Sequence, residues 1–138
     1  MRALGADLMR SQVSGAVITL RGDLGTGKTT MVRGALESQG ITSVRSPTYT
    51  LVEYYPLDSM TVVHLDLYRL ADAEELEYLG FRDYLNPETL CFIEWPERAQ
   101  GYLQSVDLEI RLDYDPEGRS VRLSAHTPAG ERLLSRLT

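Results

Sequence analysis

The segment spanning residues 22–29 constrains the fold of this chain more than any other part of the sequence. Its letters, GDLGTGKT, match the pattern G-x-x-x-x-G-K-[ST] at every fixed position. It follows a short apolar run, residues 16–20, with the character of a strand buried on both faces. It precedes residues 29–39, where we predict a helix that ends at Gly40. A glycine-rich turn between a buried strand and a helix predicts an α/β fold with a phosphate-binding loop.

Each part of this loop has a chemical role in binding a nucleotide. Glycines permit backbone angles at which successive N–H groups turn inward around an anion, and the following helix adds its positive end. Lys28 is the only lysine in the chain, and its compact ammonium suits the β- and γ-phosphates. Thr29 offers a hydroxyl to Mg²⁺. The predicted nucleotide-binding residues are Gly22, Asp23, Leu24, Gly25, Thr26, Gly27, Lys28, Thr29 and Thr30.

The rest of the sequence predicts one α/β domain over residues 1–138, because apolar strands alternate with helical segments and no linker divides them. The predicted helices are residues 2–12, 72–79 and 129–137, and the predicted strands are residues 48–55, 61–67 and 90–95. Residues 107–114 and 119–125 alternate strictly around the turn 115–118 and predict an antiparallel hairpin. We therefore expect a mainly parallel sheet flanked by helices and extended by this C-terminal hairpin.

Two acids are candidates for a second contact to a nucleotide-bound metal. Asp66 ends the apolar run TVVHLD and Glu94 ends LCFIE, and such strand-end acids usually hold or orient the metal in a phosphate-binding site. The pattern alone does not rank the two. His64 is interpreted as a histidine satisfied within the sheet, Cys91 as a small buried hydrophobe, and Trp95 as a core residue in preference to a neighbour of the nucleotide.

Thr48 and Thr50 lie in the segment SPTYT, which follows the helix after the loop. Many proteins with this loop carry there a switch segment that senses the γ-phosphate, and threonine hydroxyls suit contact with metal or phosphate. A plain loop leading into a strand is an equal alternative.

Composition and charge exclude several classes of protein. The chain has a formal net charge of −6, so it is a poor nucleic-acid binder by itself, and any RNA in its biology is expected to be held by a partner. No apolar run approaches the roughly 20 residues that a membrane span needs. The N-terminus lacks the features of a secretory signal, and a single cysteine forms no intrachain disulfide. We expect a cytoplasmic protein.

Five segments, in this order and spacing, closely resemble the TsaE (YjeE) family of small bacterial P-loop ATPases. They are GDLGTGKTT, SPTYTLVEYY, HLDLYRL, EELEYLGFRDYL and FIEWPER, and the resemblance covers essentially the whole chain. It implies a P-loop fold, binding of ATP with Mg²⁺, and hydrolysis that is slow alone and faster with partners. Those partners would be TsaD and TsaB, which make threonylcarbamoyladenosine in tRNA. Hydrolysis would reset the TsaD–TsaB assembly between turnovers, and tRNA would be met only through that complex.

The resemblance also assigns roles to individual residues. Residues 22–30 would cradle the phosphates, with Lys28 as a catalytic residue, and Thr29 and Glu94 would bind the metal. Asp66 would orient the attacking water, and Thr48 and Thr50 would belong to the switch segment.

Two other classes of protein carry a phosphate-binding loop of this kind and are alternatives to the ATPase. A P-loop small-molecule kinase usually has an arginine-bearing lid, whereas the region after Asp66 is acidic, although Arg69 and Arg82 remain. A GTP-switched binding module would need an N-K-x-D segment, and the only lysine is already at position 28. The kinase is the alternative to the ATPase.

Overall fold

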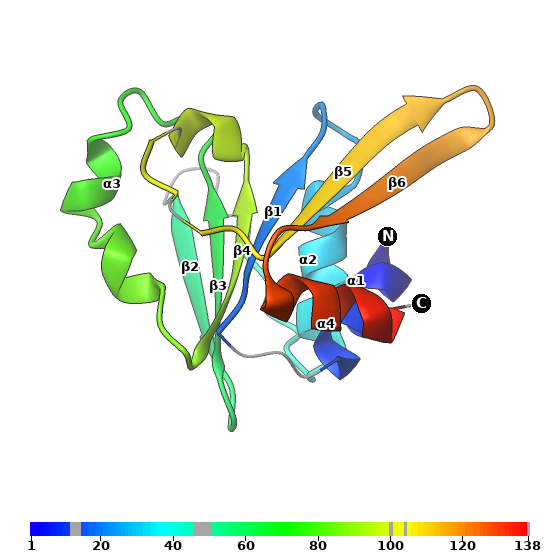
Figure 1. Cartoon of the computed structure of the whole chain (residues 1–138), viewed down its shortest axis with the longest axis horizontal. Coiled ribbons are helices and arrows are strands. Elements are labelled where there is room, and N and C mark those ends of the chain that lie inside the picture. Colours follow the sequence, from blue (N-terminus) through cyan, green and yellow to red (C-terminus); the bar gives the residue numbers. More distant parts are fainter. Residues whose placement is uncertain (12–14, 46–50, 100, 104, 138) are drawn as a thin grey trace.

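The computed structural model describes residues 1–11, 15–45, 51–99, 101–103 and 105–137, and it places six strands in one sheet, in the order β2-β3-β4-β1-β5-β6 (Figure 1). The strands are β1 (Val17–Arg21), β2 (Val52–Pro56), β3 (Thr61–Asp66), β4 (Thr89–Glu94), β5 (Leu108–Asp115) and β6 (Gly118–Ala125). The α-helices are α1 (Arg2–Arg10), α2 (Lys28–Glu37), α3 (Glu75–Tyr78) and α4 (Pro128–Leu137), and two 3₁₀ helices are η1 (Phe81–Tyr84) and η2 (Pro96–Ala99).

The four central strands, β3, β4, β1 and β5, run parallel, whereas β2 and β6 pair antiparallel to the outer two. This is the predicted fold, a mainly parallel sheet with an antiparallel C-terminal hairpin. Parallel strands bring their carboxyl ends to one edge of the sheet. The loop after β1, the last residue of β3 and the last residue of β4 therefore meet at that edge.

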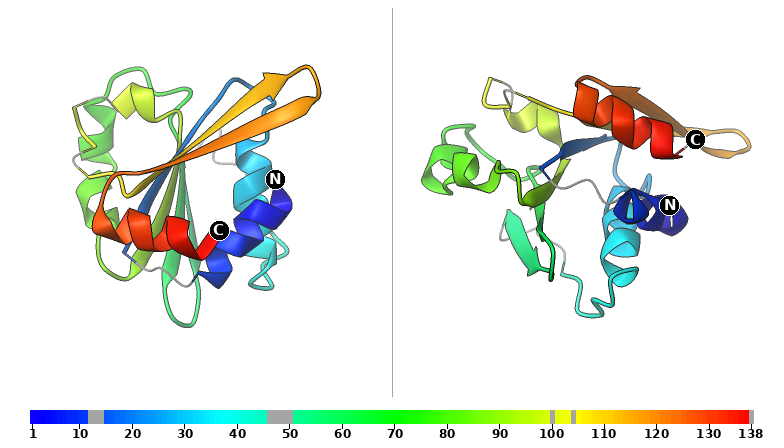
Figure 2. Two further views of the ribbon diagram at one scale, coloured as in Figure 1. Left: turned by 45° about the vertical axis from the view of Figure 1, so that its right-hand side comes forward. Right: turned by 60° about the horizontal axis from the view of Figure 1, so that its bottom comes forward.

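Helices cover both faces of the sheet, as Figures 1 and 2 show from three directions. Side chains of α1, α2 and α4 pack on Ile18, Phe92 and Ile110, which belong to one buried cluster. The alternate side chains of β1 and β4, including Val17 and Ile93, pack on the other face with residues of α3, η1 and η2. Burial on both faces explains the continuous apolar runs of β1, β3 and β4, whereas β5 alternates between buried and exposed side chains. No helix in the described ranges has the length and apolar character to span a membrane.

Helices α1 and α2 approach each other closely at two glycines. A Cβ atom on Gly5 would lie 1.9 Å from the carbonyl oxygen of Met31, and one on Gly34 would lie 2.4 Å from the carbonyl oxygen of Arg2. No larger residue fits at either position without a backbone shift. This contact holds the N-terminal helix against the helix that follows the glycine-rich loop.

Element boundaries differ most from prediction in the acidic segment after β3. The helix predicted over residues 72–79 is shortened at its start to the four-residue α3, because the amides of Glu75 and Leu76 donate to the carbonyl oxygens of Asp72 and Ala73, three residues back, and residues 73–74 form a turn. At the end of α3, Gly80 adopts a left-handed φ of 71° and the chain continues into η1. The Asp72 carboxylate accepts the amide of Glu74 at 3.0 Å, so Asp72 caps the turn that precedes α3 and not α3 itself. Of the strand predicted over residues 48–55, the structure describes only the part from residue 51, and β2 begins at Val52.

Candidate functional site

The loop between β1 and α2 needs its glycines. Gly25 and Gly27 have φ of 82° and 109°, in the left-handed region that residues with a Cβ rarely adopt. At Gly22 a Cβ would lie 2.5 Å from the carbonyl oxygen of Leu112 on the neighbouring strand β5. The first two residues of α2 are Lys28 and Thr29, so the positive end of that helix faces the loop. The loop has the backbone geometry of an anion-binding nest.

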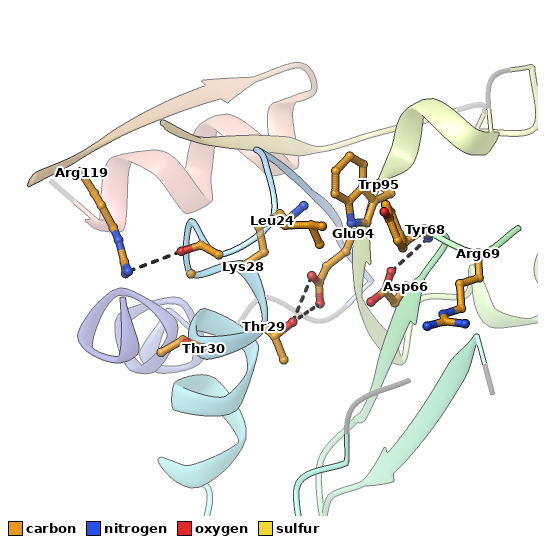
Figure 3. Close-up of a pocket in the computed structure, with 12 residues that line it drawn as sticks. Leu24, Lys28, Thr29, Thr30, Asp66, Tyr68, Arg69, Glu94, Trp95 and Arg119 are labelled. Atoms are coloured by element: carbon orange, nitrogen blue, oxygen red, sulfur yellow. Dashed lines mark hydrogen bonds between the residues drawn. The ribbon is translucent and has the colours of Figure 1, made fainter. Parts of the chain in front are cut away.

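A cavity of about 390 Å³ opens over this loop at the carboxyl edge of the sheet (Figure 3). Six of the nine loop residues predicted to bind a nucleotide line it, namely Leu24, Gly25, Gly27, Lys28, Thr29 and Thr30. The other three, Gly22, Asp23 and Thr26, complete the loop, and the buried Thr26 hydroxyl donates to the Asp23 carbonyl at 2.8 Å. The remaining wall consists of Asp66, Tyr68, Arg69, Glu94, Trp95 and Arg119.

Lys28 is folded over the loop. Its Nζ donates to the carbonyl oxygen of Gly22 at 2.5 Å. The same atom lies 3.6 Å from the centroid of the Trp95 ring, and both side chains are labelled in Figure 3. Burial lowers the pKa of Lys28, while the nearby carboxylates of Glu94 and Asp66 oppose that shift. The ammonium thus lies between a backbone carbonyl and an aromatic face, in the cavity that Glu94 and Asp66 also line.

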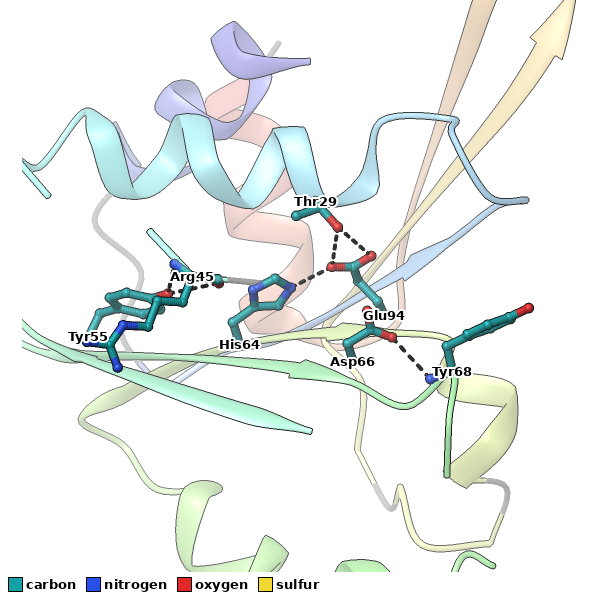
Figure 4. Close-up of polar contacts among 7 residues, drawn as sticks. All are labelled: Thr29, Arg45, Tyr55, His64, Asp66, Tyr68 and Glu94. Carbon is teal, nitrogen blue, oxygen red and sulfur yellow. Dashed lines mark hydrogen bonds and ion pairs between the residues drawn. The ribbon is translucent and has the colours of Figure 1, made fainter. Parts of the chain in front are cut away.

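Thr29 and Glu94 meet directly. The Thr29 hydroxyl lies 3.0 and 3.1 Å from the two carboxylate oxygens of Glu94, and the second partner of that carboxylate is His64, whose Nε2 lies 2.5 Å from Oε2 (Figure 4). Glu94 is only 2% exposed and His64 is fully buried. A hydroxyl and a carboxylate are oxygen ligands of the kind that Mg²⁺ prefers.

Asp66 lies beside Glu94, because the two residues are partners in the register of β3 and β4. One of its carboxylate oxygens accepts the amide of Tyr68 at 3.1 Å. Burial raises the pKa of Asp66, and the charge of Glu94 adds to that shift. The structure therefore brings both predicted acids to the cavity, but of the two it is Glu94 that contacts Thr29.

The oxygen ligands that Thr29 and Glu94 offer fit a metal that binds together with a phosphate. Among the described residues no three His, Cys, Asp or Glu side chains are grouped to hold a metal ion by themselves. Thr29 and Glu94 supply two oxygens, and Mg²⁺ usually completes its octahedron with phosphate oxygens and water. These residues fit Mg²⁺ bound together with a nucleotide better than a permanently bound metal.

His64 is satisfied within the sheet as predicted, but the sequence did not indicate the contacts that His64, Trp95, Tyr114 and Arg119 make at the site. His64 contacts Glu94, Trp95 contacts Lys28, and the hairpin reaches the loop through Tyr114 and Arg119, which both donate to the carbonyl oxygen of Gly25 at 2.5 and 3.4 Å. The predicted core position of Trp95 is half right, because the indole packs against the buried cluster of the α3 face and also lines the cavity. The switch candidates Thr48 and Thr50 lie outside the described residues.

A glycine-rich loop joining a buried parallel strand to a helix, with acids ending two neighbouring strands, defines a fold of the P-loop class. Within it, the chain belongs to the TsaE family, as its resemblance predicts, because the family model described as threonylcarbamoyl adenosine biosynthesis protein TsaE matches residues 1–121. That description places the family in the biosynthesis of threonylcarbamoyladenosine.

Individual relatives agree with this assignment. The chain is 48% identical over 120 residues to the tRNA threonylcarbamoyladenosine biosynthesis protein TsaE of Haemophilus influenzae, covering 86% of this chain and 76% of that protein. It is 40% identical over 97 residues to the protein of the same name from Bacillus subtilis, covering 70% and 60%. The crystal structure of Bacillus subtilis YdiB superposes with a TM-score of 0.80 at 28% identity, covering 99% of this chain and 85% of that one.

Proposed function

We propose that this protein binds ATP with Mg²⁺ and hydrolyses it as a component of the machinery that makes threonylcarbamoyladenosine in tRNA. The observation that carries the proposal is the contact between Thr29 and Glu94, 3.0 and 3.1 Å long, beside Lys28 on the wall of the loop cavity. A hydroxyl on the loop and an acid on the next strand supply the two protein ligands of a nucleotide-bound metal.

The loop would bind the phosphates. Its backbone amides and the N-terminal end of α2 would face the β-phosphate, and Lys28 would exchange its contact with the Gly22 carbonyl for contacts with phosphate oxygens. Arg119 reaches the same cavity from the hairpin and would add a second positive charge. The lowered pKa of Lys28 reflects a buried charge for which a phosphate would be a stronger partner than a carbonyl.

Thr29 and Glu94 would hold Mg²⁺. When bound, the metal would supply positive charge against the oxygens of the transferred phosphate. Glu94 is buried and its carboxylate is already fixed by Thr29 and His64, so little side-chain freedom would be lost on binding.

Asp66 would orient the attacking water. It lies one strand further from the loop than Glu94, lines the same cavity and has no hydrogen bond to Thr29 among the described contacts. Its backbone contact with Tyr68 fixes the carboxylate at the end of β3. A carboxylate in that position can accept a hydrogen bond from water and aim its lone pair at the γ-phosphate.

The TsaD–TsaB pair would be the partner, and ATP hydrolysis would reset that pair between turnovers. The net charge of −6 supports a role in which tRNA is held by the partner proteins. The isolated chain is accordingly expected to retain little tRNA at physiological salt.

The test is phosphate release from ATP with and without purified TsaD and TsaB, in Mg²⁺ and in EDTA. We expect slow Mg²⁺-dependent release that rises on addition of the pair and disappears in Lys28→Ala. Glu94→Gln should lose the dependence on Mg²⁺, whereas Glu117→Gln, at the exposed hairpin turn, should behave as wild type. Phosphate release at the wild-type rate in Lys28→Ala would contradict the proposal.

The same reaction mixture separates the ATPase from a small-molecule kinase. The observation that favours a kinase is the pair of arginines, Arg69 and Arg119, on the cavity wall. With γ-labelled ATP, an ATPase delivers the label to inorganic phosphate alone. Label appearing on a small acceptor would support the kinase instead.

A further inference from the structure

His64 is a fully buried histidine whose role the proposed hydrolysis does not include. Its Nε2 lies 2.5 Å from Oε2 of Glu94, and among the described residues its Nδ1 has no hydrogen-bond partner (Figure 4). The contact with Glu94 is therefore the one polar contact of this ring within the described structure. A histidine that served only to fill space would make an isolated polar group in the core at a cost that an apolar side chain avoids.

The sheet register explains why these two residues meet. His64 on β3 is the partner of Phe92 on β4, and Asp66 is the partner of Glu94, so His64 and Glu94 are diagonal neighbours on adjacent strands. Side chains two residues apart on a strand share a face. His64 and Glu94 thus lie on the face of the sheet that α2 covers, and Thr29 lies in the first turn of that helix.

The direction of the hydrogen bond follows from the chemistry of the acceptor. A carboxylate only accepts hydrogen bonds, so a short contact to Oε2 requires the proton of the ring to be on Nε2. The Thr29 hydroxyl donates from the other side, at 3.0 Å to Oε2 and 3.1 Å to Oε1. Glu94 is held between a donor on β3 and a donor on α2.

We propose that His64 is a positioning residue for Glu94: it donates its Nε2–H to Oε2 and holds the carboxylate in the orientation that faces Thr29 and the cavity. The proposal rests on the metal-binding role given to Glu94 above. Donors behind a ligating carboxylate fix its orientation, and their loss typically lowers metal affinity about 10- to 100-fold. Without the imidazole, the Glu94 side chain would be free to turn away from Thr29 while the phosphate loop stayed intact.

The first experiment uses the unmodified protein. Long-range ¹H–¹⁵N NMR correlations of the histidine rings distinguish the Nε2–H tautomer from the Nδ1–H tautomer. The two histidines are told apart by the spectrum of His126→Gln, since His126 is exposed and its ring pairs with Glu109, not with Glu94. The Nε2–H tautomer is expected for His64. An Nδ1–H tautomer would overturn the proposal without any variant that could fail to fold.

The second experiment measures how much Mg²⁺ strengthens binding of a fluorescent, non-hydrolysable ATP analogue, as the ratio of its Kd in EDTA to its Kd in Mg²⁺. We expect His64→Leu to reduce this ratio about 10-fold or more and to leave the Kd in EDTA within about twofold of wild type. His64→Gln, whose amide can donate from a similar position, should recover most of the ratio. An undiminished ratio in His64→Leu would contradict the proposal.

A double-mutant cycle separates action through Glu94 from a general loss of packing. Glu94→Gln removes the carboxylate that would bind the metal. In that background, adding His64→Leu should not lower the ratio of the Kd in EDTA to the Kd in Mg²⁺ any further. A loss that persists in the Glu94→Gln background would show that His64 does not act through Glu94. If Glu94→Gln itself leaves the ratio unchanged, the proposed metal site fails, and that outcome is distinct from a failure of His64 alone.

Discussion

The hydroxyl of Thr29, in the first turn of α2, lies 3.0 Å from the carboxylate of Glu94, the last residue of β4, across a separation of 65 residues in the chain. This pair is the ligand set proposed above for a nucleotide-bound metal, at the carboxyl edge of the sheet.

Thr29→Val tests this pair, because valine keeps the shape of threonine and removes only the hydroxyl. We expect Mg²⁺ to strengthen nucleotide binding about 10-fold less in Thr29→Val than in wild type, since one charge-assisted contact is lost. Thr29→Ser should retain the effect. Isothermal titration calorimetry with and without Mg²⁺ measures it, and equal behaviour of the valine and serine variants would argue against a metal-binding hydroxyl.

Lys28 is expected to be irreplaceable, even by another cation. Lys28→Ala should weaken nucleotide binding by roughly 10- to 100-fold through loss of a charged hydrogen bond. Lys28→Arg should fail similarly, because the planar guanidinium is larger than the space between the Gly22 carbonyl and the Trp95 ring. Equilibrium binding of labelled ATP is the measurement. Full affinity in Lys28→Arg would mean that charge alone is required there.

Asp66 should make stability depend on pH. Burial raises its pKa above the ordinary value of 3.8, so the folded chain binds this proton more tightly than the unfolded chain does. The stabilising contribution of protonation is complete below that value and is lost as the pH rises through the raised pKa. Asp66→Asn removes the cost of the buried charge and keeps an oxygen for the Tyr68 amide.

We therefore expect nucleotide-free Asp66→Asn to melt at a higher temperature than wild type at pH 7, with the gain shrinking toward pH 4. Asp58→Asn, at an exposed position, is the matched control and should show no such trend. Thermal denaturation across this range measures the difference. A gain of the same size at both pH values would show that the buried charge is not its cause.

Asp107 should be a stability residue remote from the cavity. Its Oδ2 accepts the amide of Val17 at 2.7 Å and its Oδ1 accepts the hydroxyl of Thr127 at 2.6 Å, which ties the start of β1 to the start of α4. Asp107→Ala leaves a buried amide without a partner and should cost about 2–4 kcal/mol of unfolding free energy. Asp113→Ala, exposed on β5, the strand that follows Asp107, should cost less than about 0.5 kcal/mol. Urea denaturation compares them, and similar midpoints would refute this role.

The loop and its flanking elements could be predicted because the information is local. A strand, a glycine-rich turn and a helix follow one another within residues 16–39, and each glycine has a backbone reason visible in its spacing. The hairpin was predictable for the same reason, since β5, its turn and β6 are contiguous. The acidic segment was harder to predict, because Asp72 and the glutamates favour a helix, whereas the residues before Glu75 form a turn with hydrogen bonds to carbonyls three residues back.

The contacts across the site could not be predicted, because they depend on the register between strands distant in sequence. Alternation along β3 places His64 and Asp66 on one face, but only the pairing of β3 with β4 puts His64 beside Glu94. Only the contact with Thr29 distinguishes Glu94 from Asp66, which the strand-end pattern left equal. The position of Trp95 at the cavity could not be predicted, because its φ of 58° is left-handed and an apolar run in the sequence does not indicate such a turn.

The position of Trp95 has a practical consequence. It is the only tryptophan in the chain, and its ring lies 3.6 Å from the ammonium that the phosphate loop presents. When tryptophan is excited selectively over the eight tyrosines, the emission of the protein therefore originates from a single indole on the wall of the cavity. Any ligand that draws Lys28 away from the indole alters the emission directly, so the protein reports occupancy of its own site without a label.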